Sequence, residues 1–167
     1  AIAESPSVAA TAGKASGLLD IEGGSVEMLY GNPNCVLGAD GAGTLRIAGN
    51  GSFLTRAFLV LSNNVASTLQ IALNPTGAPL LRARGVRIAP GAKLEVDVSQ
   101  YAGDERWIRL LRTENGTTAL DRQGAFAPED ITIIGGHGEY NVVQTRPGDA
   151  TKSFWLHRKK GFAIFIR

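Results

Sequence analysis

Cysteine and histidine are scarce in this chain, which has one cysteine and two histidines among 167 residues. Cys35 has no second cysteine, so an intramolecular disulfide and a metal site built from several cysteines are both excluded. His137 and His157 do not form a His-x-x-x-His pair, so a zinc ion would need carboxylates for most of its ligands. We therefore expect no cofactor and no metal centre.

Long hydrophobic runs and a strong net charge are also missing. Residues 57–61 (AFLVL) are among the longest apolar runs, far below the roughly 20 residues of a membrane-spanning helix. The net charge is only +2, which is too small for the concentrated basic face of a nucleic-acid-binding protein. The one tight basic run, HRKK at 157–160, is typical of a solvated turn. No membrane span and no nucleic-acid partner are expected.

Catalytic motifs are absent too. Ser25 and Ser52 each follow a glycine, but neither has the final glycine of a Gly-x-Ser-x-Gly nucleophile elbow. Some paired acids have the spacing that glycoside hydrolysis needs, yet acids that alternate with apolar residues on strands usually serve solubility. The pairs are Asp20/Glu22, Glu95/Asp97, Asp104/Glu105 and Glu129/Asp130. The chain is predicted not to be an enzyme.

Glycine, in contrast, is abundant, with 21 residues, and 44% of the chain is hydrophobic. The glycines separate short apolar runs, as expected of many short strands joined by tight turns. One apolar-polar-apolar triplet recurs, and its first residues are 26, 24 and 25 positions apart. The copies are Leu19-Asp20-Ile21, Leu45-Arg46-Ile47, Leu69-Gln70-Ile71 and Leu94-Glu95-Val96.

Such a period is typical of stacked repeats. The predicted fold is all-β, a right-handed parallel β-solenoid in which equivalent positions stack about 4.8 Å apart. The apolar residues of the triplets then form two inward rows, and the middle residues form an outward row without adjacent like charges. An antiparallel β-sandwich or jelly roll, whose strands recur at similar spacing, is the alternative.

The chain divides into three predicted parts. Residues 1–16 are rich in Ala and Ser and are expected to be an arm, and residues 17–100 form the repeat solenoid. Residues 101–167 diverge from the repeat and are expected to be a hairpin-rich cap and assembly region. Within this cap, residues 131–134 and 140–143 are predicted to form one hairpin, and 153–157 and 162–166 another.

The segments GLLDIEGGSVEM, VLGADGAGTLRIAGNGSF and FLVLSNNVASTLQIAL resemble the glycine-rich repeats of bacterial secreted β-solenoids, the autotransporter-passenger-like and autotransporter-associated repeat proteins. Copies in that family often carry a Gly-Thr-Leu-x-Ile strand before a Gly-Asn turn, which here is GTLRI at 43–47 followed by Gly49-Asn50. The resemblance covers about residues 17–100. It implies a structural, adhesive or glycan-contacting role outside the cell or at its surface.

The last segment of the chain suggests self-assembly. Residues 162–166 (FAIFI) are almost wholly apolar, and such a strand is an aggregation hazard unless it is buried or paired. We therefore expect a non-enzymatic structural protein that forms a homo-oligomer, either a trimer or a filament, by β-strand addition. Its assembly residues are predicted to be Phe162, Ile164, Phe165 and Ile166.

Two alternatives remain open. A secreted glycan-binding module that contacts polysaccharide would use aromatic side chains as stacking platforms. The candidates are Trp107, Trp155 and Tyr140, with Tyr30 and Tyr101 as further aromatics. A capsid-decorating protein of a virion is the other alternative, because the start at Ala1 fits removal of an initiator Met as well as cleavage of a secretory leader.

Overall fold

The computed structural model describes residues 16–28, 34–39, 41–62, 66–113, 122–144, 146, 148 and 153–159. Within these ranges the regular structure is β-strand, apart from two single turns of 3-10 helix, η1 (Pro128–Asp130) and η2 (Gly136–Gly138).

Five strands form the first sheet in the order β1-β4-β6-β8-β11, and every neighbouring pair is parallel. The strands are β1 (Ser16–Ile21), β4 (Ala42–Ile47), β6 (Ser67–Ala72), β8 (Lys93–Asp97) and β11 (Ile131–Ile134).

Eight strands form the second sheet in the order β12-β13-β9-β7-β5-β2, with β3 beside β5 and β10 beside β7. Its pairs are parallel except β12–β13 and β13–β9, which are antiparallel. The strands are β2 (Ser25–Met28), β3 (Cys35–Leu37), β5 (Ser52–Leu61), β7 (Leu80–Ile88), β9 (Trp107–Thr113), β10 (Arg122–Gln123), β12 (Tyr140–Val143) and β13 (Phe154–Arg158).

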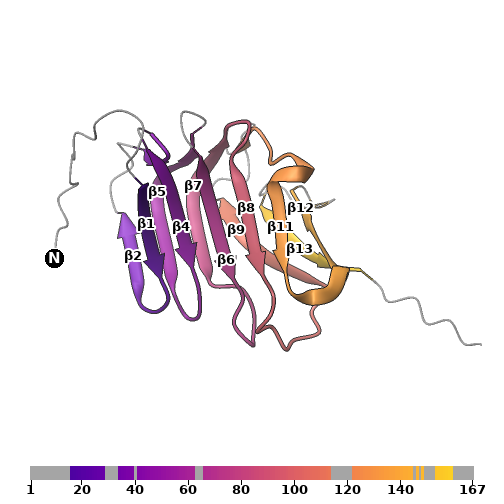
Figure 1. The fold of residues 1–167 in the computed structure, drawn as a ribbon. Coiled ribbons are helices and arrows are strands. Elements are labelled where there is room, and N and C mark those ends of the chain that lie inside the picture. Colours follow the sequence, from indigo (N-terminus) through magenta and orange to yellow (C-terminus); the bar gives the residue numbers. More distant parts are fainter. Residues whose placement is uncertain are drawn as a thin grey trace, which may run out of the picture.

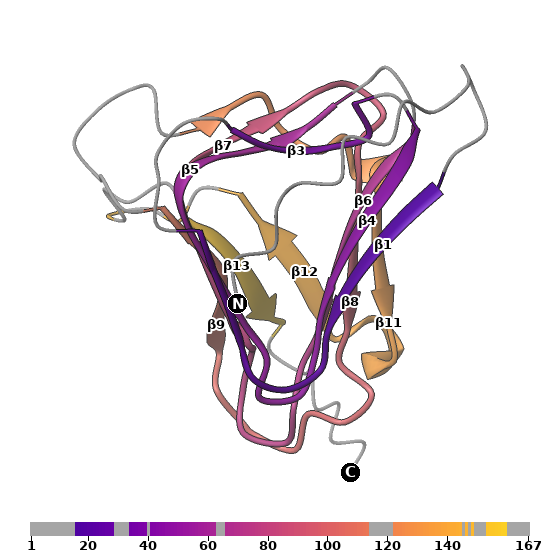
Figure 2. The ribbon, with the colours of Figure 1, turned by 90° about the vertical axis from the view of Figure 1, so that its left-hand side faces the viewer.

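The strands stack as the coils of a three-sided solenoid (Figure 1). Figure 2 looks along the axis from the N-terminal end: the chain runs down a strand of the first sheet and returns up a strand of the second. It then crosses a third side, which β3 shares with the later parts of β5 and β7. The coil turns clockwise as it recedes from the viewer, so the solenoid is right-handed. This parallel, coiled arrangement confirms the predicted fold and excludes the antiparallel sandwich.

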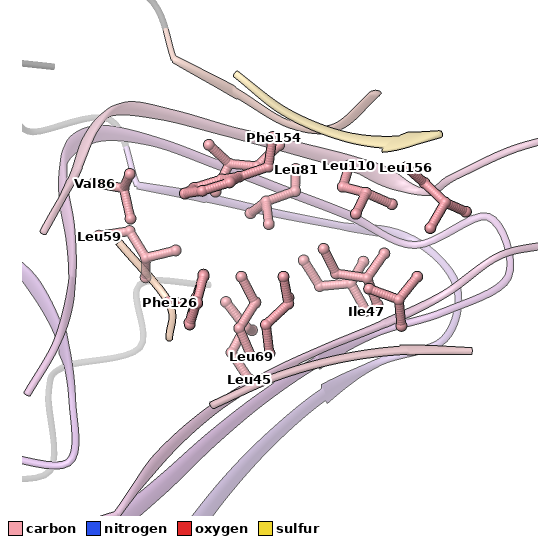
Figure 3. Close-up of a cluster of buried hydrophobic side chains, with 14 of the residues drawn as sticks. Leu45, Ile47, Leu59, Leu69, Leu81, Val86, Leu110, Phe126, Phe154 and Leu156 are labelled. Atoms are coloured by element: carbon pink, nitrogen blue, oxygen red, sulfur yellow. The ribbon is translucent and has the colours of Figure 1, made fainter. Parts of the chain in front are cut away.

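The stacking predicted for the triplets is confirmed by the strand register. Leu45 lies opposite Leu69, and Leu69 lies opposite Leu94 on the next coil. The second row stacks in the same way, in the order Ile21, Ile47, Ile71 and Val96. These side chains lie in one buried cluster that the second sheet closes from its own inner face (Figure 3). The largest fully buried members are Phe53, Phe154, Leu45, Ile47, Leu59, Leu61, Leu69, Ile71, Leu81, Leu94, Leu110 and Leu111.

The middle residues of the triplets form the predicted outward row. Nη1 of Arg46 donates to Oδ1 and Oδ2 of Asp20 on the preceding coil, at 2.7 and 3.0 Å. Nε2 of Gln70 donates to Oε2 of Glu95 at 2.7 Å. Each polar side chain of this row therefore has a partner one coil away, as cross-strand pairing favours.

A side-chain hydrogen bond supports the corner where β5 bends from the second side to the third. The ladder between β5 and β7 shifts register between Thr55 and Phe58, and this irregularity frees backbone groups from strand pairing. Oγ1 of the buried Thr55 accepts a hydrogen bond from the backbone N–H of Ala57 at 3.0 Å. The corner thereby turns without leaving that buried donor unsatisfied.

The solenoid continues beyond residue 100, since β9 lies parallel to β7 and β11 lies parallel to β8. The predicted hairpin of 131–134 with 140–143 is wrong, because β11 and β12 belong to different sheets. Ile131 and Ile133 extend the two inward rows beyond Leu94 and Val96, so the segment is a further coil and not a hairpin arm. Residues 154–158 form β13, which pairs with β12 and β9, and the predicted partner at 162–166 lies outside the described residues.

The inward rows predict that truncating an inward leucine destabilises the protein far more than truncating an outward one. Leu69 is 1% exposed, whereas Leu80 is 51% exposed on the outer side of β7. Leu69→Ala should lower the free energy of unfolding by about 2–5 kcal/mol because it leaves a cavity between coils. Leu80→Ala should change it by about 0.5 kcal/mol or less. Urea unfolding followed by circular dichroism measures both, and similar losses for the two variants would contradict the row.

The hydrogen bond between Thr55 and the Ala57 N–H predicts a second effect on stability. Thr55→Val keeps the side-chain shape but leaves the Ala57 N–H unsatisfied, which should cost about 1–3 kcal/mol of unfolding free energy. Thr44→Val, on the outer side of β4, is the matched control and should cost about 0.5 kcal/mol or less. Equal urea midpoints for wild type and Thr55→Val would show that the hydrogen bond does not stabilise the corner.

Candidate functional site

The first coil has an open edge. β1 ends the first sheet and β2 ends the second, so no described strand lies beyond either of them (Figure 1). Leu19 occupies the inward row opposite Leu45, yet it is 42% exposed, and Leu18 beside it is 64% exposed. The inward row is therefore incomplete at this end, where unpaired backbone groups and aliphatic side chains are both accessible.

The predicted assembly residues belong to the segment 162–166. Phe162, Ile164, Phe165 and Ile166 lie outside the described residues, as does Tyr30.

The two tryptophans lie side by side on the outer face of β9 and β13. Trp107 pairs with His157, and Trp155 pairs with Arg109. The guanidinium carbon of Arg146 is 4.9 Å from each indole centroid, and that of Arg109 is 4.5 Å from Trp155. Cation–π contacts therefore occupy the ring faces on which a neutral sugar would stack.

His157 extends this cluster. Its ring centroid is 4.2 Å from that of Trp107, and its Nδ1 lies 3.1 Å from Oδ1 of Asn141. Nε of Arg106 donates to Nε2 of His157 at 3.2 Å, so Nε2 is the accepting nitrogen. Burial lowers the pKa of His157, and the positive charge of Arg106 lowers it further. Both effects favour the neutral imidazole of His157.

Tyr140 is separate from the tryptophans. It is 8% exposed and packs with the core. Together with Tyr101 it borders an open hollow of about 570 Å³ that residues 98–99, 102–104 and Arg158 also line. Nη2 of Arg158 pairs with Oε2 of Glu139 at 3.2 Å beside this hollow. Burial raises the pKa of the Tyr101 hydroxyl, although a hydrogen bond from the backbone of Glu105 opposes this shift. The three predicted stacking residues therefore do not form one platform.

The candidate acids Glu95 and Asp97 have structural partners. Glu95 and Asp97 project from the outer face of β8 beside a shallow hollow of about 120 Å³, which Ile134 also borders. Glu95 accepts from Gln70, and Oδ1 of Asp97 accepts from the backbone N–H of Ser99 at 2.9 Å. Over the described ranges, no group of three or more His, Cys, Asp or Glu side chains gathers as a metal site.

Cys35 is half-buried on β3 and packs against the core. Burial raises the pKa of its thiol, which keeps the nucleophilic thiolate scarce near neutral pH. Cys35 therefore packs as a small apolar residue.

One feature escaped the sequence interpretation. The outer sides of β5, β7 and β9 carry six arginines, and these three strands contain no acidic residue. We call this area the arginine surface. Its members are Arg56, Arg82, Arg84, Arg87, Arg109 and Arg112. The sequence carries only part of this signal. Period-two alternation relates Arg82 to Arg84, whereas Arg84 and Arg87, like Arg109 and Arg112, are three residues apart and share the outer face only because two consecutive residues between them are buried.

The part of the chain that the structure describes contains no helix of the length and hydrophobicity needed to cross a bilayer.

The tryptophan cluster makes a spectroscopic prediction. Arg146→Ala removes the guanidinium that contacts both indoles and should raise the quenching of tryptophan fluorescence by acrylamide, because the part of each ring that Arg146 covers gains access to solvent. Trp107 and Trp155 are the only tryptophans, so the signal is unambiguous. Arg112 is exposed, and no contact with a tryptophan is seen for it, so Arg112→Ala should leave quenching unchanged. Identical quenching of wild type and Arg146→Ala would show that Arg146 does not cover the rings in solution.

Comparison of the chain with protein-family models, with curated proteins and with solved structures finds no match.

Proposed function

We propose that this protein is a non-enzymatic structural protein that self-associates by β-strand addition at a cell or particle surface. The observation that supports it best is the open edge of the first coil, where Leu18 and Leu19 are exposed beside the unpaired side of β1. The surface location rests on the resemblance of residues 17–100 to secreted repeat solenoids.

The energetic reason for self-association lies in the contrast between the first coil and the second. Leu45 and Ile47 are fully buried, because coils lie on both sides of them. On the first coil Ile21 is buried, but Leu19 is not. A strand added beside β1 would extend the inward row, and full burial of an exposed leucine contributes about 1.5–3 kcal/mol.

The edge also lacks the features that usually prevent strand addition. Natural edge strands are commonly blunted by lysine, proline, a bulge or an inward-pointing charge. β1 has the sequence SGLLDI, which contains no lysine or proline, and it pairs with β4 over six residues without a register shift. Its one charge, Asp20, points outward and is already paired with Arg46. β1 is therefore a regular strand with an accessible pairing side.

A charge placed in the open row tests this proposal. Leu19→Lys places a charge in the inward row that a strand added from another copy of the chain could not cover. This variant should therefore be a monomer. Leu80→Lys is the matched control, because Leu80 is similarly exposed but lies on the outer side of an interior strand. It should leave assembly unchanged. Sedimentation velocity of the full chain over a range of concentrations measures both.

Three outcomes bear on the proposal. A wild-type chain that sediments as a monomer at every concentration, or equal loss of assembly in both variants, would contradict it. Circular dichroism establishes that Leu19→Lys is folded. Deletion of residues 162–167 tests the other predicted assembly segment: assembly that survives this deletion but not Leu19→Lys would assign the contact to β1.

A further inference from the structure

We propose that residues 162–166 of one copy of this chain add as a strand to the open edge of β1 in the next copy, so that the copies join head to tail. This inference rests on the self-association proposed above, and it names the two surfaces that meet. The acceptor is the unpaired side of β1, where Leu18 and Leu19 are exposed. The donor is the apolar segment FAIFI.

The backbone of β1 has the hydrogen-bonding groups that an added strand needs. The carbonyl of Ile21 accepts a hydrogen bond from the backbone N–H of Ala48, directly after β4, at 2.9 Å. In a parallel sheet the N–H and C=O groups of alternate residues point to opposite neighbours. Leu18 and Asp20 therefore direct their backbone groups toward the open edge, where no described strand pairs with β1.

The donor segment repeats the spacing of the inward rows. Each strand of the first sheet contributes two aliphatic inward residues with one residue between them, as Leu19 and Ile21 do on β1. Ile164 and Ile166 have the same spacing. Every pair of strands in the first sheet is parallel, and a parallel donor strand would place Ile164 over Leu19 and Ile166 over Ile21. The donor would thus continue both rows by one more step.

The two phenylalanines of the donor also fit this register. Phe162 would lie over Gly17, and apart from the chain neighbours of Gly17 no heavy atom lies within 4 Å of the position that a Cβ would take there. Phe165 would point outward beside Asp20, within diagonal reach of Leu18. Leu18 is 64% exposed, more than any other large apolar side chain among the described residues. The added strand would therefore cover both exposed leucines of β1.

A chain cannot bring this segment to its own β1. β13 directly precedes Lys159 and lies at the opposite end of the solenoid from β1 (Figure 1). Four inter-strand steps separate β13 from β2 of the first coil, or about 19 Å at roughly 4.8 Å for each step. Lys159 and Phe162 are three residues apart, and an extended chain covers at most about 11 Å over that interval. The donor strand at β1 must therefore come from another copy.

The donor and the acceptor thus lie at opposite ends of each copy. A contact between two different surfaces is heterologous, and repeated heterologous contacts produce an open filament unless the rotation between copies closes a ring. Because the two surfaces lie at opposite ends of the solenoid axis, successive copies would follow one another along that axis. Of the two assemblies expected from the sequence, this arrangement favours the filament over the trimer.

Two variants that each lack one half of the contact test the proposal. Leu19→Lys removes the acceptor and keeps the donor, whereas deletion of residues 162–167 removes the donor and keeps the acceptor. Each variant alone should sediment as a monomer. An equimolar mixture should form a heterodimer and nothing larger, because only one contact can form between the two chains. Sedimentation velocity at equal total concentration measures both variants and their mixture.

Three further chains serve as controls. Ile164→Lys is a second donor variant of full length and should behave as the deletion does. Leu80→Lys should assemble alone as wild type does, because Leu80 lies on the outer side of β7, away from the open edge. A chain that carries both Leu19→Lys and the deletion should stay monomeric when it is mixed with either single variant. Circular dichroism checks that every variant is folded.

The outcomes separate this inference from the proposed function. If the deletion variant still assembles alone while Leu19→Lys does not, the head-to-tail contact is wrong and self-association at β1 stands. A mixture that stays monomeric although wild type assembles would likewise overturn the head-to-tail contact. A wild-type chain that is monomeric at every concentration would overturn both proposals together.

Discussion

The stacking of aliphatic side chains between successive coils is the constraint on which the rest of this structure depends. Parallel pairing in register places Leu45, Leu69 and Leu94 over one another, and the same register aligns the second row beside them. A one-residue slip would move every one of these side chains to the outer face. The inward rows therefore fix the register, and the register in turn decides which polar residues meet on the outside.

The outer faces of the two sheets are consequently free to differ in their polar residues, and they do differ. The first sheet pairs its polar side chains between neighbouring coils, as Arg46 does with Asp20. On the second sheet, β5, β7 and β9 carry arginines and no acid, and Arg87 and Arg109 lie against Phe58 and Trp155. Both faces rest on the same buried rows, so the difference between them is not required by the fold.

The fold could be predicted because its determinants are local and repeated: alternation within a triplet and nearly constant spacing between triplets. The prediction that Ile131–Ile134 forms a hairpin arm was wrong because a Gly-rich turn can follow a solenoid strand as well as a hairpin strand. Gly135 has a positive φ (78°), which either kind of turn would require. The arginine surface was missed because a net charge sums over the whole chain. Only the pairing of β7 with β9 places Arg82 beside Arg112. No spacing rule relates Arg146 to the two tryptophans.

The open first coil also affects how the protein unfolds. In a solenoid each coil contacts only its neighbours, so stability is approximately a sum of nearest-neighbour contributions and is graded along the axis. A coil with a neighbour on one side only, such as the first, is then less stable than the interior coils. Its amide hydrogens should exchange with solvent through local fraying long before those of β4 and β6, which open only when the interior coils do. Unfolding should therefore start at a terminal coil and not in the interior.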